Sequence, residues 1–362
     1  RFKGFTDAWE ERKLGEIFNY EQPTKYIVKS TEYDDNFNTP VLTAGKSFLL
    51  GYTDEISGIK NATVENPVVI FDDFTTDSHY VDFPFKIKSS AMKLLSLNDN
   101  SDNFYFMFNT LKNIKYVPQS HERHWISKFS SFVIYKPSQE EQQKIGSFFK
   151  QLDDTIALHQ RKCDQTKELK KTMLQKMFPK KGERIPEIRF PEFTDEWEER
   201  LFGDLLNETR VKTTVEDEDT LLSCAIDGMY LNSELFSHFR GSSNIGYLKV
   251  KKNDLILSAQ NLHLGNCNVN LRFEHGMVSP AYKVYELVDC APLFMQAWVK
   301  RDSTKIFFLR TSTEGASVCR KNILWDELYK QPLAVPILAE QQRIGTYFQT
   351  LDQDIAQIEK KL

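Results

Sequence analysis

The chain has 362 residues, of which 40% are hydrophobic and 27% are charged, and its formal net charge is −4. That length exceeds one ordinary hydrophobic core, so two or more domains are expected, and the composition excludes a disordered or fibrous protein. No run approaches the roughly 18 apolar residues that a membrane-spanning helix needs, and the slight acidity gives no general argument for nucleic-acid binding.

The five cysteines indicate a reducing compartment. They are widely spaced and include no C-x-x-C pair, so neither a disulfide framework nor a thiolate zinc site is expected. The first residues, RFKGF, contain no initiator methionine and no apolar signal segment. We therefore interpret the chain as part of a cytoplasmic protein whose native start is missing.

The first predicted domain covers residues 1–136. It opens with a flank, residues 1–18, that contains the run FTDAWEER at positions 5–12. Residues 19–136 then alternate short apolar runs, such as residues 67–71, with polar loops, a pattern typical of strands. We expect a compact domain with a mixed α/β (α+β) fold.

A long helix is predicted for residues 137–178. Ser138 and Glu141 have the spacing of a capping box, and no proline interrupts the following run before Pro179. Apolar residues recur in alternating steps of four and three, which is the period of a coiled-coil seam. The first seam residues are Ile145, Phe149, Leu152 and Ile156.

The second half of the chain repeats this series. A charged connector with proline and glycine, residues 179–192, leads to a second domain at 193–335, whose flank at 193–206 opens with FTDEWEER. Residues 336–362 form a second predicted helix, which we interpret as truncated because the first helix continues past the matching point. Its seam residues are Ile344, Phe348, Leu351, Ile355 and Ile358.

The repeat is confined to the flanks and the helices. Seven of eight residues agree between positions 5–12 and 193–200, and the motif EQQ-x-IG at 141–146 returns at 340–345. The blocks between these motifs differ in length by 11 residues and show no convincing similarity. Copied flanks would meet one kind of partner twice, whereas unlike blocks would meet two targets. A scaffold that merely survived an old duplication is the alternative.

Two helices with narrow apolar seams must bury those seams, and within one chain the simplest partner is the other helix. If the helices run antiparallel, they form a rod with one globular block at each end. The predicted fold is therefore α+β, with two globular domains joined by two long antiparallel coiled-coil helices in an internal pseudo-twofold repeat.

The motifs do not indicate catalysis. Residues 45–47 (GKS) match the end of a phosphate-binding loop, but Pro40 stands where its first glycine should be. His121 and His124 lack a third ligand, so a polar turn is favoured over a metal site. Acidic residues at 72, 73 and 77 lack the usual partner in a metal-dependent nuclease, an acidic residue two positions before a lysine on a neighbouring strand, so a strand that enters a polar loop is favoured. A binding or assembly function without cofactor or metal is expected.

The order of the motifs resembles the specificity (S) subunit of type I restriction-modification systems. The shared series is RF-x-x-FTD-x-WEER, a variable block, and EQQ-x-IG on a long helix that carries Leu-Asp, followed by a connector and the same series again. The resemblance covers essentially the whole chain. It implies a non-catalytic, DNA-binding subunit in which each block is a target-recognition domain for one half of a bipartite, asymmetric site in double-stranded DNA.

The resemblance also implies partners. The helices would set the spacer between the half-sites and dock two methyltransferase (modification) subunits, which motor-nuclease (restriction) subunits would join in the full complex. Two alternatives remain open: the recognition portion of a single-chain restriction-methylation enzyme, and a duplicated coiled-coil protein adaptor that binds no specific DNA. The candidates for partner docking are Trp9, Arg12, Trp197, Arg200, Gln142 and Gln341.

Candidate DNA contacts come from local clusters of polar and basic residues, since neither block has a marked basic excess. Asn and Gln can pair with adenine, Arg with guanine, and Ser, Thr and Lys can hold phosphates. For any one residue, a solvated loop is an equally good interpretation. The candidates are Thr75, Thr76, Ser78, His79, Tyr80, Lys86, Lys88, Ser89, Ser90 and Lys93 in the first block, and Gln260, Asn261, His263, Arg310, Thr311, Ser312, Thr313, Arg320 and Lys321 in the second.

Overall fold

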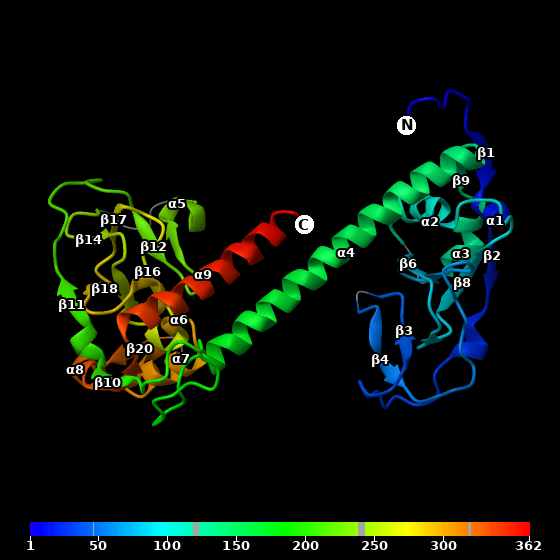
Figure 1. Ribbon diagram of the computed structural model, residues 1–362. Helices are drawn as coiled ribbons and strands as arrows, with labels where there is room; N and C mark the ends of the chain where they lie inside the picture. The colour runs from blue at the N-terminus through cyan, green and yellow to red at the C-terminus, as the bar shows by residue number, and fades with distance from the viewer. Residues whose placement is uncertain (46, 119–122, 238–242, 318–319) are drawn as a thin grey trace. The chain divides into compact units, whose positions relative to one another are not determined.

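The computed structural model describes residues 1–362 apart from 46, 119–122, 238–242 and 318–319. The chain divides into two compact units, Arg1–Ala157 and Leu158–Leu362, each of which is described by itself (Figure 1). Residue 46 of the GKS run and His121 of the histidine pair lie outside the described residues.

The first unit contains a four-stranded antiparallel sheet with the order β2-β8-β5-β6. The central strand β5 reads VVIFD and its first four residues are buried, as expected for a strand covered on both faces. Phe71 of this strand packs edge-on against Trp125 and Phe129. The strands are β2 (Phe18–Glu21), β5 (Val68–Asp72), β6 (Ser78–Val81) and β8 (Met92–Leu97).

Helices and smaller sheets surround this sheet. Helix α2 (Phe104–Lys112) begins at the N-cap Asn103, whose side chain accepts a hydrogen bond from Phe106 N, and it buries Phe106, Met107, Phe108 and Leu111 in the core of the unit. The remaining elements are β1 (Glu10–Lys13), α1 (Leu14–Ile17), η1 (Pro23–Tyr26), β3 (Thr39–Leu42), β4 (Leu49–Thr53), β7 (Lys86–Ile87), α3 (His124–Ser127), η2 (Phe129–Ser131) and β9 (Val133–Lys136).

The second unit contains a four-stranded antiparallel sheet with the order β11-β18-β15-β16. Helix α6 (Pro292–Val299) follows the sheet and buries Phe294, Met295 and Trp298 in the largest core of the chain. The sheet strands are β11 (Leu206–Thr209), β15 (Leu255–Ser258), β16 (Cys267–Val269) and β18 (Tyr282–Leu287).

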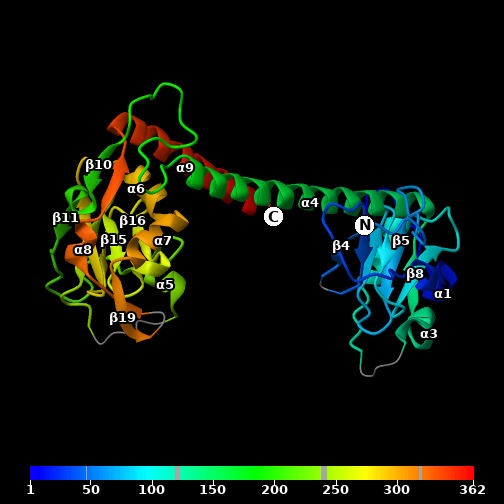
Figure 2. The same ribbon diagram turned by 90° about the horizontal axis from the view of Figure 1, so that it is seen from below.

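The other elements of the second unit are short. They are β10 (Glu198–Leu201), η3 (Phe202–Leu205), β12 (Leu222–Cys224), β13 (Met229–Leu231), α5 (Asn232–Leu235), β14 (Leu248–Lys251), η4 (Leu262–Leu264), β17 (His275–Val278), α7 (Asp302–Leu309), β19 (Ser312–Ser317), β20 (Arg320–Ile323), α8 (Trp325–Tyr329) and β21 (Pro332–Val335). Figure 2 shows β19 at the side of this unit that lies away from α9 (Leu338–Glu359).

The two sheets share one topology. In the first sheet, β2 follows the flank and pairs with β8, β8 pairs with β5, and β5 pairs with β6, the next strand in sequence. In the second sheet, β11, β18, β15 and β16 pair in the same order. Each flank also forms a two-stranded ribbon with the strand before the next helix, β1 with β9 and β10 with β21. Blocks without recognisable sequence similarity thus build the same strand order.

Helix α4 (Gln139–Lys176) is continuous over 38 residues, and α9 has 22 residues. Within the second unit, Lys167 of α4 pairs with Glu359 at 2.7 Å and Lys170 pairs with Asp352. The residue numbers rise on one helix as they fall on the other, so this part of α4 and α9 run antiparallel. Figure 1 shows the two helices side by side.

Burial of the seam differs between the two helices. In α9, Ile344, Phe348, Leu351 and Ile358 are buried. In the first half of α4, Phe149, Leu152 and Ile156 remain 40%, 44% and 43% exposed, contrary to the expectation of a seam buried along its whole length. The seam residues differ in burial because α9 is shorter than α4. The last turn of α9 pairs with Lys167, which lies about three helical turns beyond Ile156 on α4.

Candidate functional site

The first flank folds back onto the start of α4. Arg1 Nε and Nη2 donate to Glu141 Oε1 and Oε2 at 2.8 and 2.9 Å, and Trp9 Nε1 donates to Glu141 Oε2 at 3.3 Å. The Glu141 side chain is buried, so these donors replace the water that a carboxylate would otherwise need. The hydrogen bonds from Arg1 lower the pKa of Glu141 below its ordinary value.

This pairing alters the predicted capping box. Ser138 Oγ accepts a hydrogen bond from Glu141 N at 3.4 Å, as a capping residue would. The Glu141 carboxylate, however, binds Arg1 and Trp9. The Ser-x-x-Glu spacing therefore marks the helix start, while the glutamate anchors the flank to the helix.

The end of the connector and the second flank make corresponding contacts. Arg189 Nε and Nη2 donate to Glu340 Oε1 and Oε2 at 2.7 and 2.8 Å, and Trp197 Nε1 donates to Glu340 Oε1 at 3.3 Å. Glu340 and Trp197 are both buried. The copied arginine, tryptophan and glutamate thus form one structural unit twice.

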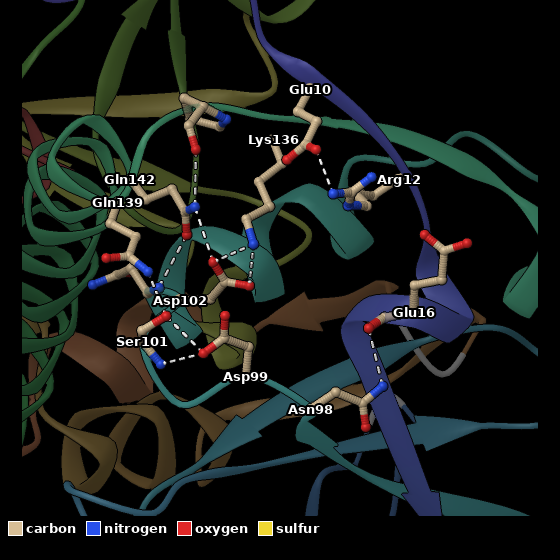
Figure 3. Close-up of polar contacts among 12 residues, drawn as sticks. Glu10, Arg12, Glu16, Asn98, Asp99, Ser101, Asp102, Lys136, Gln139 and Gln142 are labelled. Carbon is tan, nitrogen blue, oxygen red and sulfur yellow. Dashed lines mark hydrogen bonds and ion pairs between the residues drawn. The ribbon is translucent and has the colours of Figure 1, made fainter.

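The glutamine that follows each glutamate joins the helix to the rest of its unit. Gln142 Oε1 accepts from Asn103 N at 3.0 Å, and its Nε2 donates to Pro137 O at 3.0 Å and to Asp102 Oδ1 at 3.1 Å. Asp102 also pairs with Lys136 at 2.7 Å. Figure 3 shows the Gln142 amide and the Lys136 ammonium group meeting at the Asp102 carboxylate.

Gln341 repeats this geometry. Its Oε1 accepts from Ala291 N at 2.7 Å, and its Nε2 donates to Pro336 O at 2.9 Å. Ala291 is the N-cap of α6, just as Asn103 is the N-cap of α2. Each glutamine therefore links the start of a long helix to the start of a helix in the globular part of its own unit.

Sequence reasoning missed the glycine that ends each EQQ-x-IG motif. A Cβ on Gly146 would lie 2.0 Å from Asn103 Oδ1, and a Cβ on Gly345 would lie 2.5 Å from Leu293 Cβ and 2.7 Å from Phe294 N. A Cβ at residue 146 would therefore displace the Asn103 side chain, and one at residue 345 would displace the start of α6. The recurrence of this glycine in both copies of the motif was the available signal.

We use the term helix joint for this set of residues. The first joint consists of Arg1, Trp9, Glu141, Gln142 and Gly146, and the second consists of Arg189, Trp197, Glu340, Gln341 and Gly345.

The contacts of the helix joints argue against a docking role for four of the six candidate residues. Gln142, Gln341 and Trp197 are buried and hold their own unit together, and Trp9 is half-buried with its Nε1 bound to Glu141. These four side chains offer little surface to a partner. Arg12 is exposed on the β1–β9 ribbon, and Arg200 is half-buried on the β10–β21 ribbon, so their role in docking stays a prediction.

Two candidate DNA-binding lysines in the first unit are buried, which contradicts that role. Lys86 Nζ lies 2.9 Å from Glu55 Oε2 and donates to Ser57 O at 2.7 Å. Lys93 lies in β8, is fully buried, and its Nζ is 3.3 Å from Asp73 Oδ2. Both ammonium groups neutralise carboxylates of the same unit and cannot reach a DNA phosphate.

The pairing with Lys86 gives a pH-dependent contribution to stability. Its hydrogen bond, together with those from the backbone of Ser30 and Lys29, lowers the pKa of Glu55 to about 2. The ordinary value of a glutamate is about 4.3, so this contribution is present above about pH 4.3 and is lost as pH falls towards 2. Glu55→Gln should therefore reduce the difference in unfolding free energy between pH 5 and pH 3. Urea melts at both pH values, with exposed Glu65→Gln as the control, measure this effect.

The remaining candidates of the first unit lie around edge strand β6. Thr75 and Thr76 form the β5–β6 turn, in which Asp72 Oδ1 accepts from Phe74 N and Thr75 N. Ser78, His79 and Tyr80 are half-buried; His79 Nε2 lies 3.1 Å from Ala44 O, and burial raises the pKa of Tyr80 to about 12. Lys88 and Ser89 are half-buried, and Ser90 is exposed.

The candidates of the second unit converge at one place. Lys321 N donates to Gln260 O at 3.0 Å, which brings the loop after β15 beside the β19–β20 hairpin, although the two segments are far apart in sequence. The exposed candidates of this unit are Gln260, Arg310, Thr313 and Arg320, and the half-buried candidates are Asn261, Ser312 and Lys321.

Two other candidates in this unit are buried and are not available to DNA in this structure. His263 lies in the 3-10 helix η4, and Thr311 Oγ1 donates to Phe308 O at 3.3 Å. Their neighbours Leu262 of η4 and Phe308 of α7 belong to the hydrophobic core of this unit. Their polar character in the sequence therefore reflects internal hydrogen bonding or packing.

Two findings concern metal sites and membrane-spanning helices. The described residues contain no set of three or more His, Cys, Asp or Glu side chains arranged to bind a metal ion. Among the helices of these same residues, none combines the length and apolar character needed to cross a membrane.

This chain is similar to known proteins in sequence and in structure. The model of the type I restriction modification DNA specificity domain matches residues 6–168. The type I restriction enzyme EcoR124I/EcoR124II specificity subunit of Escherichia coli is 48% identical over 135 residues, which are 36% of this chain and 33% of that protein. The match thus spans about a third of the length of this curated relative.

Two solved structures align with nearly the whole chain. The S subunit of a type I restriction-modification system from M. genitalium aligns with 99% of this chain and 93% of its own, at 13% identity and a TM-score of 0.63. The HsdS subunit of Thermoanaerobacter tengcongensis aligns with 99% and 92%, at 14% identity and a TM-score of 0.41. The first likeness confirms the mixed α/β fold.

Proposed function

We propose that this chain is a specificity subunit of a type I restriction-modification system and that its two units each read one half of a split DNA site. The match of the DNA specificity domain model to residues 6–168 supports this proposal. We call residues 19–136 and 207–335 the first and second reader. The shared strand order of the two readers supports this proposal, because two similar scaffolds with different surface residues suit two related tasks with different targets. In this proposal the chain binds DNA in the cytoplasm and performs no catalysis itself.

The second reader offers the clearer candidate surface. The exposed or half-buried residues Gln260, Thr313, Arg320 and Lys321 combine amide, hydroxyl and cationic groups on the loop after β15 and the adjoining β19–β20 hairpin. These groups suit base edges and phosphates. Because the chain as a whole carries a net charge of −4, we propose that bound methyltransferase subunits supply part of the cationic surface around the DNA.

The finer architecture is part of the same proposal. We propose that the seams of α4 and α9 belong to an antiparallel coiled coil that sets the spacer between the half-sites and carries two methyltransferase subunits, to which motor-nuclease subunits are added. The ion pairs between α9 and the second half of α4 support the antiparallel direction. At 1.5 Å per residue, α4 is about 57 Å long, more than one DNA turn of about 34–36 Å.

Arg320→Ala tests the assignment of the second reader. If Arg320 binds a guanine, the variant with its methyltransferase partner should lose about 1–3 kcal/mol of discrimination at one half-site and leave the other half-site unchanged. Sequencing of methylated DNA from cells that carry each variant measures both half-sites. Exposed Lys252, which pairs with Glu274, provides the control Lys252→Ala.

The outcomes separate the alternatives. A parent protein that produces no bipartite methylation pattern and binds no specific DNA with its partner would favour a protein adaptor. A pattern that changes at both half-sites in Arg320→Ala would contradict the assignment of one reader to one half-site.

A further inference from the structure

The helix joint is the only extended motif that both copies keep at the level of sequence and of individual hydrogen bonds among the described residues. In each copy, an arginine and a tryptophan bind a buried glutamate, and the next residue, a buried glutamine, binds the N-cap of a reader helix. The readers themselves share no recognisable sequence. The duplicated contacts therefore serve something common to both halves that does not depend on the DNA sequence that is read.

The geometry of Gln142 shows what that common task requires. Its amide accepts from the N-cap of α2, donates to Pro137 O at the end of the β1–β9 ribbon, and donates to Asp102 ahead of α2. One planar group thus bonds both to Pro137, just ahead of the start of α4, and to the two residues just before α2. Because Gln142 is buried, water cannot easily replace these bonds, and the rotation of the helix about its own axis is restricted.

A second contact defines the direction of the helix. Tyr105 of α2 donates its hydroxyl to Asp153, which lies about three turns further along α4 than Gln142. The ring of Tyr105 also packs against Tyr80 of the edge strand β6, at 5.1 Å between ring centroids. Two fixed points about 16 Å apart determine the angle at which α4 leaves the first reader.

We propose that Gln142 and Gln341 are positioning residues that fix the angle between each reader and its long helix, and that this angle helps to select the spacer length of the DNA site. This inference rests on the function proposed above. Over α4, about 57 Å long, a change in angle of about 3–4° moves the far end by about 3.4 Å, the rise of one base pair, and over α9, about 33 Å long, about 6° has the same effect. A change of a few degrees in the angle at a helix joint is therefore enough to admit a spacer that is one base pair shorter or longer.

The test compares Gln142→Ala and Gln341→Ala with Gln151→Ala and Gln349→Ala, which change exposed glutamines on the same two helices. Tyr105→Phe is included because it removes one hydroxyl, leaves no cavity, and weakens the second fixed point. Each full-length variant is expressed with its methyltransferase partner, and genomic methylation is sequenced. Thermal melting of each purified variant shows whether it folds.

We expect the joint variants to keep the bases of both half-sites and to raise methylation at spacers one base pair shorter or longer by about tenfold, equivalent to 1.4 kcal/mol of discrimination. The controls should keep the parental spacer. A loss of stability alone would lower methylation at all sites without broadening the spacer. That broadening therefore distinguishes positioning from general support of the fold.

Folded joint variants that retain a single parental spacer would overturn the inference, as would a change in the recognised bases. If Gln142→Ala and Gln341→Ala do not fold, the spacer length selected by Tyr105→Phe tests the inference. This variant is expected to broaden the spacer in the same way but to a smaller degree. Absence of bipartite methylation by the parent would instead contradict the proposed function. The two failures are therefore distinguishable.

Discussion

Glu340→Ala is expected to lower the free energy of unfolding of the second unit by about 3–5 kcal/mol. Glu340 accepts two hydrogen bonds from Arg189 and one from Trp197, and its side chain is 1% exposed. Removal of one partner from a buried ion pair leaves the other charge without compensation, and that desolvation accounts for most of the loss. The Arg189 side chain is itself only 12% exposed, so water can restore little of the lost interaction.

Guanidinium chloride melts followed by circular dichroism measure this change. Glu359→Ala is the matched control on the same helix, since the ion pair of Glu359 with Lys167 is half exposed on both sides and should contribute at most about 1 kcal/mol. The double variant Arg189→Ala with Glu340→Ala should be more stable than the sum of the single losses predicts. Equal effects of Glu340→Ala and Glu359→Ala would show that the joint does not stabilise the unit.

Gly345→Ala is expected to destabilise the second unit by about 3 kcal/mol, and more than Gly146→Ala destabilises the first. The new methyl group on residue 345 meets Leu293 Cβ at 2.5 Å and the backbone nitrogen of Phe294 at 2.7 Å, so α6 must move away from α9. Overpacking of this kind costs about 1–3 kcal/mol, or more where backbone must shift. Alanine recovers about 1 kcal/mol of helix propensity, which only partly offsets the clash.

In the first unit the nearest obstacle is the end of a flexible side chain. The Asn103 amide can rotate away from a Cβ on residue 146, at the cost of its cap on Phe106 N, which is worth about 1 kcal/mol. Thermal melts of both variants test this order, with the exposed Thr346→Ala as the control. A larger loss in Gly146→Ala than in Gly345→Ala would contradict the account based on backbone contact.

The candidate DNA contacts show that the sequence does not tell which polar residues are exposed in the fold. Gln260 and Lys321 were both selected as polar loop residues, and a backbone hydrogen bond places their loops side by side. Lys86 and Lys93 were selected on the same criterion, but each is buried against a carboxylate. A lysine in a polar stretch looks the same whether its ammonium group faces solvent or a distant acid of its own fold.

The sequence by itself determined the features that depend on neighbouring residues or on identity between segments: the duplicated flanks, the Pro/Gly connector, and the helices, whose period of apolar residues is a local property. Only the tertiary structure decided what the copied residues do. Arg1 and Glu141 are 140 positions apart, and their pairing follows from the fold, because a buried charge must be matched by whichever group lies next to it in space. For the same reason, two blocks with unrelated sequences proved to share one strand order, since strand pairing depends on backbone hydrogen bonds and on an apolar core that many different side chains can fill.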